Sequence, residues 1–248
     1  MKNLAYILLF LTQALFAQDA FEKGNEQFRQ GQYDQAIATY EGILKGGQES
    51  AELYFNLGNA YFKQEQVAPA IYNYEKALLL DPGNEDIEIN LGYARELITD
   101  NIEPVARPGL SGFMSGLSGM YHYDSWGWIA IVCAFLVLAL FAGYYFTKKT
   151  ALKRGFFAGM TLMGVMLLFS LTAGFHAKSE VDSEHPAIVF SEMVQVKAQP
   201  SAQGDDTFIL HAGIKVNVLE TKEQWQKVRM PDDSEGWVPS EAIKQLAP

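Results

Sequence analysis

Residues whose types could do chemistry are few in this chain, and they are scattered. The four histidines stand in different segments and share no metal-ligand spacing: His122, His176, His185 and His211. Glu184 lies beside His185 in a polar stretch, and Ser111 and Ser118 have no companion base of known proximity. The sequence contains no motif that cradles a phosphate or exposes a nucleophilic serine. We therefore expect a protein that is not an enzyme and that uses no cofactor and no metal.

Charge and cysteine content narrow the function classes further. The chain has 248 residues, with 19 Lys and Arg against 29 Asp and Glu, which gives a net charge of −10. A nucleic-acid binder would need a basic patch to meet phosphates, so this class is not expected. The single cysteine, Cys133, can form neither an internal disulfide nor a structural zinc site.

A 34-residue period runs through residues 18–103. Gly24, Gly58 and Gly92 are each separated by 34 residues. Five pairs keep the same interval: Ala36 and Ala70, Tyr40 and Tyr74, Phe28 and Phe62, Ile37 and Ile71, and Asn25 and Asn59. A fixed period of this length indicates helical hairpins in which each unit packs on the next.

The second unit, residues 51–82, closely resembles a tetratricopeptide repeat. Eight positions match the family signature: Tyr54, Leu57, Gly58, Tyr61, Ala70, Tyr74, Ala77 and Pro82. The first unit keeps Gly24, Ala36 and Tyr40, and the third keeps only Leu91 and Gly92 before it stops ahead of Pro104. The resemblance implies an all-α tetratricopeptide domain over residues 18–103, built from two helical hairpins and a capping helix.

In this family, first-helix side chains line a concave groove that binds peptides. Carried onto this sequence, the groove residues are Phe21, Asn25, Phe28, Arg29, Phe55, Asn56, Asn59, Phe62, Lys63 and Asn90. The alternative is that the aromatic side chains belong to the core and the polar ones are merely solvated. The family's clamp for a free peptide C-terminus needs a cation one turn before the groove asparagine, where Phe21 and Phe55 stand instead.

The C-terminal part of the chain has β-type patterning. Short apolar runs at residues 187–190, 194–196, 215–219 and 225–230 alternate with turn-rich stretches. Runs of this length favour a compact all-β barrel over residues 187–248.

The same region resembles the bacterial SH3 domain. The matching features are His211-Ala212-Gly213 before a strand, Trp225 followed by Lys227-Val228, and Glu235-Gly236-Trp237-Val238-Pro239 near the end. The resemblance implies an aromatic groove made by Trp225, Trp237 and Pro239, although Ala242 stands where the family's groove tyrosine is usual. Bacterial members often associate with cell-wall peptides. A purely structural barrel is the alternative.

Two central segments are apolar enough to be transmembrane helices. Residues 126–146 and 155–175 contain no charged side chain, and each is long enough to cross about 30 Å of hydrocarbon as a helix. The loop between them, residues 147–154, carries Lys148, Lys149, Lys153 and Arg154. By the positive-inside rule these four cations set the topology, with the loop in the cytoplasm and both flanks outside.

The remaining segments complete the predicted organisation. Residues 1–17 combine Lys2, a short apolar core and Ala17, a pattern typical of a secretory signal peptide, with an uncleaved anchor as the alternative. Residues 104–125 form a linker in which apolar residues at helical spacing suggest an interfacial helix. Residues 176–186 form a second linker. Together these features predict a bacterial inner-membrane protein whose soluble domains are both extracytoplasmic.

This domain order resembles a family of membrane proteins encoded in the aerotolerance-associated Bat operons. The resemblance implies von Willebrand A-type membrane proteins and a MoxR-type AAA+ ATPase system as partners. We therefore expect a non-enzymatic scaffold with two binding modules tethered to one transmembrane hairpin. The alternative function is an envelope sensor that binds cell-wall peptide through its SH3-like domain.

Overall fold

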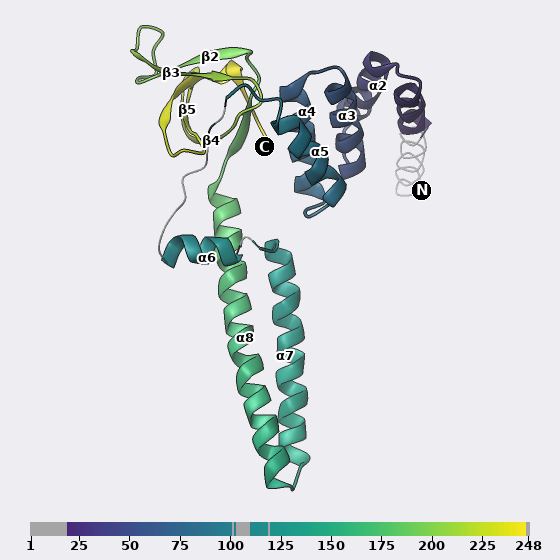
Figure 1. The fold of residues 1–248 in the computed structure, drawn as a ribbon, viewed down its shortest axis with the longest axis vertical. Coiled ribbons are helices and arrows are strands. Elements are labelled where there is room, and N and C mark those ends of the chain that lie inside the picture. The colour runs from purple at the N-terminus through teal and green to yellow at the C-terminus, as the bar shows by residue number, and fades with distance from the viewer. Residues whose placement is uncertain (1–18, 101, 103–109, 119, 247–248) are drawn as a thin grey trace, which may run out of the picture. The chain divides into compact units, whose positions relative to one another are not determined.

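A computed structural model of the chain describes residues 19–100, 102, 110–118 and 120–246 (Figure 1). The predicted signal peptide, residues 1–17, lies outside the described residues. The chain divides into two compact units. Residues 1–104 and 185–248 form one, called here the helix–barrel unit, and residues 105–184 form the other, called the hairpin unit.

The helical part of the helix–barrel unit is a stack of antiparallel helices. Residues 19–29 are helical and are followed by α2 (Tyr33–Lys45), α3 (Ala51–Lys63), α4 (Val67–Leu80) and α5 (Glu85–Arg95). The Ser50 hydroxyl oxygen accepts a hydrogen bond from the Leu53 amide at 3.1 Å and so caps the start of α3. Asn84 caps α5 in the same way through the Ile87 amide. The structure therefore contains two helical hairpins followed by a single helix.

The 34-residue period reflects a repeated contact between a glycine and a tyrosine. A Cβ atom added at Gly58 would lie 2.7 Å from the Tyr74 ring, and one at Gly24 would clash with the Tyr40 ring in the same way. Tyr40 and Tyr74 are fully buried, so neither ring has room to move aside. Each glycine is thus required for the close approach of the two helices in its hairpin.

The C-terminal part is an antiparallel sheet that curls on itself (Figure 1). Its strands are β1 (Pro186–Val189), β2 (Met193–Lys197), β3 (Asp206–His211), β4 (Lys215–Lys222), β5 (Trp225–Arg229), β6 (Glu235–Pro239) and β7 (Ile243–Gln245). The strand order is β3-β2-β6-β5-β4-β1-β7, with the 3₁₀ turn Ser240–Ala242 before β7. Val189, Val196, Val216, Val228 and Val238 form the centre of its core. The predicted all-β fold is confirmed.

The helices and the sheet share apolar contacts. Ile188 of β1 and Leu246 after β7 are buried in the same cluster as Ile71 of α4 and Leu91 of α5. In return, Ile98 packs against the core of the sheet. The sequence predicts two modules tethered to one transmembrane hairpin, and the structure packs these modules against each other in one unit.

The hairpin unit contains α6 (Leu110–Ser118), α7 (Tyr123–Phe146) and α8 (Thr150–Ser183). Both α7 and α8 are long and apolar enough to cross a membrane. They pack closely where small residues allow it, since a Cβ atom at Gly143 would lie 2.7 Å from the Phe156 ring. The indole N–H of Trp126 donates a hydrogen bond to the Ser118 carbonyl oxygen at 2.9 Å, which ties α7 to the end of α6.

The helix α8 is longer than the sequence predicts at both ends. It begins inside the predicted loop 147–154 and ends at Ser183, inside the predicted linker 176–186. The limits of the predicted span 155–175 are the last positions before a charged or polar side chain. Charged side chains are costly in hydrocarbon, but they do not end a helix. Residues 176–183 contain no Pro or Gly, and His176 lies 3.5 Å from Glu180 one turn later. The helix therefore continues through this segment.

Substituting Gly58 tests the repeated glycine–tyrosine contact. Gly58→Ala should raise hydrogen exchange of the α3 and α4 amides by about tenfold or more, because an overpacked core typically costs about 1–3 kcal/mol. The matched control is Gly42→Ala in α2, where an added Cβ would meet nothing within 4 Å. This control should leave exchange unchanged or slow it, since alanine favours helix over glycine. Equal exchange in the two variants would contradict the proposed role of Gly58.

Candidate functional site

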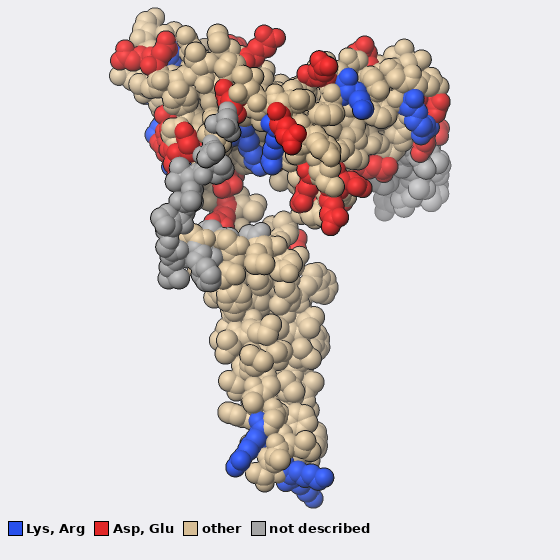
Figure 2. Space-filling model, viewed as in Figure 1, with Lys and Arg blue, Asp and Glu red and all other residues tan. Residues whose placement is uncertain are grey.

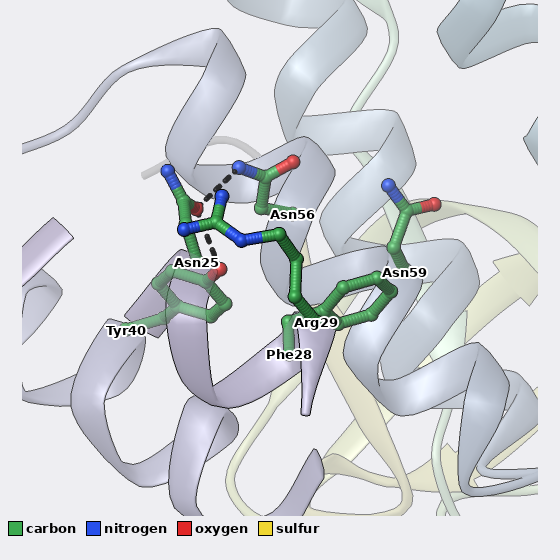
Figure 3. Close-up of a pocket in the computed structure, with 6 residues that line it drawn as sticks. All are labelled: Asn25, Phe28, Arg29, Tyr40, Asn56 and Asn59. Carbon is green, nitrogen blue, oxygen red and sulfur yellow. Dashed lines mark hydrogen bonds between the residues drawn. The ribbon is translucent and has the colours of Figure 1, made fainter. Parts of the chain in front are cut away.

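A hollow of about 260 Å³ opens on the face formed by the first helix of each hairpin (Figure 3). Asn25, Phe28 and Arg29 come from residues 19–29, and Asn56 and Asn59 come from α3. Tyr40 of α2 closes the base of the hollow. Five of the ten predicted groove residues therefore line one concavity.

Two equivalent hydrogen-bond clusters, 34 residues apart, organise this face. The Asn25 carbonyl oxygen accepts from the Tyr40 hydroxyl at 2.8 Å and from the Asn56 amide at 3.0 Å. One repeat later, the Asn59 carbonyl oxygen accepts from the Tyr74 hydroxyl at 2.8 Å and from the Asn90 amide at 2.8 Å. We call these four asparagines, Asn25, Asn56, Asn59 and Asn90, the asparagine ladder.

The ladder leaves polar atoms available for a ligand. Within the described residues, the NH₂ groups of Asn25 and Asn59 and the carbonyl oxygens of Asn56 and Asn90 make no hydrogen bond. A side-chain amide offers N–H donors and a carbonyl acceptor, which are complementary to the C=O and N–H groups of a peptide bond. The tyrosine hydroxyls fix the orientation of Asn25 and Asn59, so their free donors are preorganised.

The other predicted groove residues lie around the ladder. Phe21 and Phe55 occupy equivalent positions, with ring centroids 6.0 Å from those of Tyr40 and Tyr74 respectively. Phe62 packs against the apolar cluster shared with the sheet, and Lys63 is the last residue of α3. The aromatic members thus contribute to packing as well as to the walls of the groove.

Sequence reasoning missed Tyr40 as a site residue. The sequence identified Tyr40 only as a position that recurs at the repeat interval, and in the structure its side chain is 1% exposed. The same residue also lines the hollow through its hydroxyl end. The shared spacing of Asn25–Asn59 and Tyr40–Tyr74 was the signal that could have paired them.

Electrostatically, the groove carries few free charges. The Arg29 guanidinium donates to the Glu26 carboxylate at 2.7 Å, and both side chains are largely solvated. Burial raises the pKa of the Tyr40 phenol to about 12, so its hydroxyl remains a hydrogen-bond donor at neutral pH. Burial raises the pKa of the Tyr74 phenol as well. Binding at this face would rely on neutral hydrogen bonds and on the aromatic walls.

The three residues of the predicted SH3-like groove lie on neighbouring strands, β5 and β6, and on the same face of the sheet. Trp225 pairs with Pro239 across β5 and β6, and Trp237 lies two residues before Pro239 on the same face. Trp237 is only 9% exposed and so offers little surface to a ligand, whereas Trp225 is partly exposed. Their role in binding stays a prediction.

The structure brings together one set of side chains that could suggest catalysis. The Ser118 hydroxyl lies 3.2 Å from Nδ1 of His176, and the Glu180 carboxylate lies 3.5 Å from that same nitrogen. A catalytic relay would need the serine and the carboxylate on opposite ring nitrogens. Ser118 is also fully buried, so a substrate could not reach it. This cluster instead connects α6 to α8. Among the described residues, no group of three or more His, Cys, Asp and Glu could hold a metal.

Comparison with known families assigns both soluble regions. Residues 21–85 match the family model described as Tetratricopeptide repeat. Residues 193–244 match the family model described as Bacterial SH3 domain. No match was found among the curated proteins. The chain therefore carries a tetratricopeptide-repeat region and a bacterial SH3 domain, and both domain types are associated with binding proteins or cell-wall peptides.

The raised pKa of Tyr40 predicts alkaline sensitivity. A phenol whose folded pKa is about 12 stabilises the fold fully below its unfolded pKa of about 10, and that stabilisation is lost as pH rises through 12. The midpoint of thermal unfolding of the helices, followed by circular dichroism, should therefore fall between pH 9 and 11.5. In Tyr40→Phe the midpoint temperature should fall less over this pH range, because the variant lacks the phenol whose ionisation destabilises the fold. Tyr93→Phe, which removes an exposed hydroxyl on α5, is the control. Identical pH slopes in Tyr40→Phe and the unmodified chain would refute the assignment.

Proposed function

We propose that the chain is a non-enzymatic, membrane-anchored scaffold that binds an extended peptide segment of a protein partner in the tetratricopeptide groove. The observation that carries the proposal is the asparagine ladder, whose clusters repeat at the same 34-residue interval as the glycine–tyrosine contacts. An extended peptide also repeats its donors and acceptors along its length. The ladder thus offers polar groups at successive steps of such a backbone.

The packing of the two soluble domains supports a scaffold role. Because Ile188 and Leu246 of the barrel are buried with helix residues, the groove and the barrel are held in one geometry. A partner that contacts both surfaces would lose less conformational freedom than one binding two flexible modules. The contact with the barrel runs through α4, so the face formed by residues 19–29 and α3 stays available.

The proposed anchor is the hairpin of α7 and α8, in a bacterial inner membrane. Lys and Arg side chains gather at the end where α7 joins α8, and residues 126–175 carry no other charged side chain (Figure 2). Moving such a cluster across hydrocarbon is costly, which favours a cytoplasmic position for Lys148, Lys149, Lys153 and Arg154. Both soluble domains would then be extracytoplasmic.

The domain order supports a BatE-like role within this proposal. A BatE-like protein would act in a Bat-type membrane complex, with von Willebrand A-type membrane proteins and a MoxR-type AAA+ ATPase system as candidate partners. The second candidate function is an envelope sensor that binds cell-wall peptide. It is favoured by the match to the bacterial SH3 domain and by the register that places Trp225 opposite Pro239.

The ladder can be tested by crosslinking in intact membranes. A photo-crosslinking phenylalanine analogue in place of Phe28 should yield adducts with a protein partner. Asn56→Ala combined with Asn90→Ala should reduce these adducts by about tenfold, since each hydrogen bond contributes on the order of 1 kcal/mol. Gln195→Ala, on the exposed side of β2, is the matched control.

The double asparagine variant and Trp225→Ala together distinguish the two candidate functions. Adducts that persist in the double asparagine variant would exclude the ladder as the binding site. Under the sensor function, purified peptidoglycan should retain the full chain, and Trp225→Ala should abolish that retention. Under the scaffold function alone, Trp225→Ala should leave the crosslinked adducts unchanged.

Topology can be tested with single cysteines in a Cys133→Ser background. A membrane-impermeant maleimide added to intact spheroplasts should label Ala202→Cys in the exposed β2–β3 turn but not Thr150→Cys at the start of α8. Thr150→Cys should react once the membrane is permeabilised. Labelling of Thr150→Cys in intact spheroplasts would invert the proposed topology.

A further inference from the structure

A second cavity, of about 440 Å³, lies between the helices and the barrel. Its apolar wall is formed by Ile71, Ile98, Ile102, Ile214 and Pro231. Arg95, Asp100 and Lys215 also line it, so charged groups meet an apolar surface. A volume of this size falls within the range of small-molecule and short-peptide sites.

Two cations in this cavity share one buried carboxylate. The Glu75 side chain is 8% exposed, and its two oxygens accept from Arg95 Nη2 and from Lys215 Nζ, each at 2.7 Å. The guanidinium carries five N–H donors and the ammonium three. Within the described residues, each cation gives one hydrogen bond to Glu75, and the side chains of Arg95 and Lys215 are 51% and 42% exposed respectively. Donors therefore remain on both cations at the edge of the cavity.

The acid that lines the cavity is engaged elsewhere. One oxygen of Asp100 accepts from the His211 backbone amide at 2.7 Å, and the other lies 2.7 Å from Nδ1 of His211. Asp100 thus makes its hydrogen bonds to His211 and not to either cation, while Arg95 and Lys215 share the one carboxylate of Glu75. The charge at the Arg95–Lys215 end is locally positive.

The partners of Glu75 differ from those of the equivalent residue in the preceding repeat, Glu41. Glu41, one repeat before Glu75, accepts from the neutral hydroxyl of Tyr61 at 2.5 Å. Arg95 stands at the position of Tyr61 in the third, half repeat, and the barrel adds Lys215. Glu41 also pairs with the exposed Lys45 at 3.6 Å, so each carboxylate has a cation nearby, but only Glu75 has two cations at 2.7 Å, with Arg95 in place of the tyrosine hydroxyl.

We propose that this cavity binds the C-terminal carboxylate of a short peptide whose last residue is apolar. The carboxylate would accept hydrogen bonds from Arg95 and Lys215, and the apolar side chain would lie against the four isoleucines. This site is distinct from the asparagine ladder, and it does not depend on the function proposed for that groove.

The probe is acetyl-Ala-Ala-Val with a free carboxylate, titrated into the purified full chain in nanodiscs by isothermal calorimetry. We expect saturable binding, and at least about tenfold weaker binding of the corresponding amide, which lacks the charge that the cations recognise. The comparison of carboxylate and amide uses only the unmodified chain, so it does not depend on whether a variant folds. Lys215→Gln should also weaken binding of the carboxylate by about tenfold, whereas Lys215→Arg should retain it.

Two control variants locate the site. Lys227→Gln removes a lysine of similar exposure that pairs with Glu235 on the barrel, outside the cavity, and should bind as the unmodified chain does. Asn56→Ala, in the ladder, should also leave binding unchanged. Equal affinity for carboxylate and amide, an unaffected Lys215→Gln, or no saturable binding would each overturn the proposal.

Discussion

The junction between α4, α5 and the barrel depends on a buried carboxylate. Glu75 is nearly inaccessible to water, and an ionised carboxylate in such a place is tolerated only when it is paired and hydrogen-bonded. Arg95 supplies one partner from the neighbouring helix, and Lys215 supplies the other from the barrel. The apolar contacts of Ile71 with Ile188 and Leu246 surround this junction. Loss of either cation would leave the buried charge less compensated, so the two domains are coupled through this residue.

This coupling changes how the tetratricopeptide region is completed. A stack of two hairpins and one further helix leaves apolar surface at its open end, because each unit normally packs on the next. Here α4 and α5 bury part of that surface against the barrel through Ile188 and Leu246, and Ile98 packs into the barrel core. The barrel thus stabilises the helices, in addition to any role it has in binding a ligand. Deleting either domain would expose apolar residues of the other, so point variants are the more informative probes.

The candidate groove could be predicted in part. The period that places Asn25, Asn59, Tyr40 and Tyr74 is visible in the sequence, and the family resemblance assigns the asparagines to the concave face. The hydrogen bonds among them could not be predicted, because the same residue types could equally have been solvated. The assignment of Phe21 and Phe55 was similarly open, and their rings lie against Tyr40 and Tyr74. The helix α8 extends beyond the predicted span 155–175 at both ends, because charge limits entry into hydrocarbon whereas helix continuation depends on backbone propensity.

The sequence alone determined the local features of this protein. Repeat spacing, strand alternation and long uncharged segments each follow from interactions between residues close in the chain, so helices, strands and apolar spans could be identified in order. Only the tertiary structure decided that the first and last of these regions form one unit. Glu75 and Lys215 are separated by 140 residues, and Asp100 and His211 by 111. Pairs so far apart in the sequence produce no periodic pattern in it, because they arise from the shape complementarity of two folded surfaces.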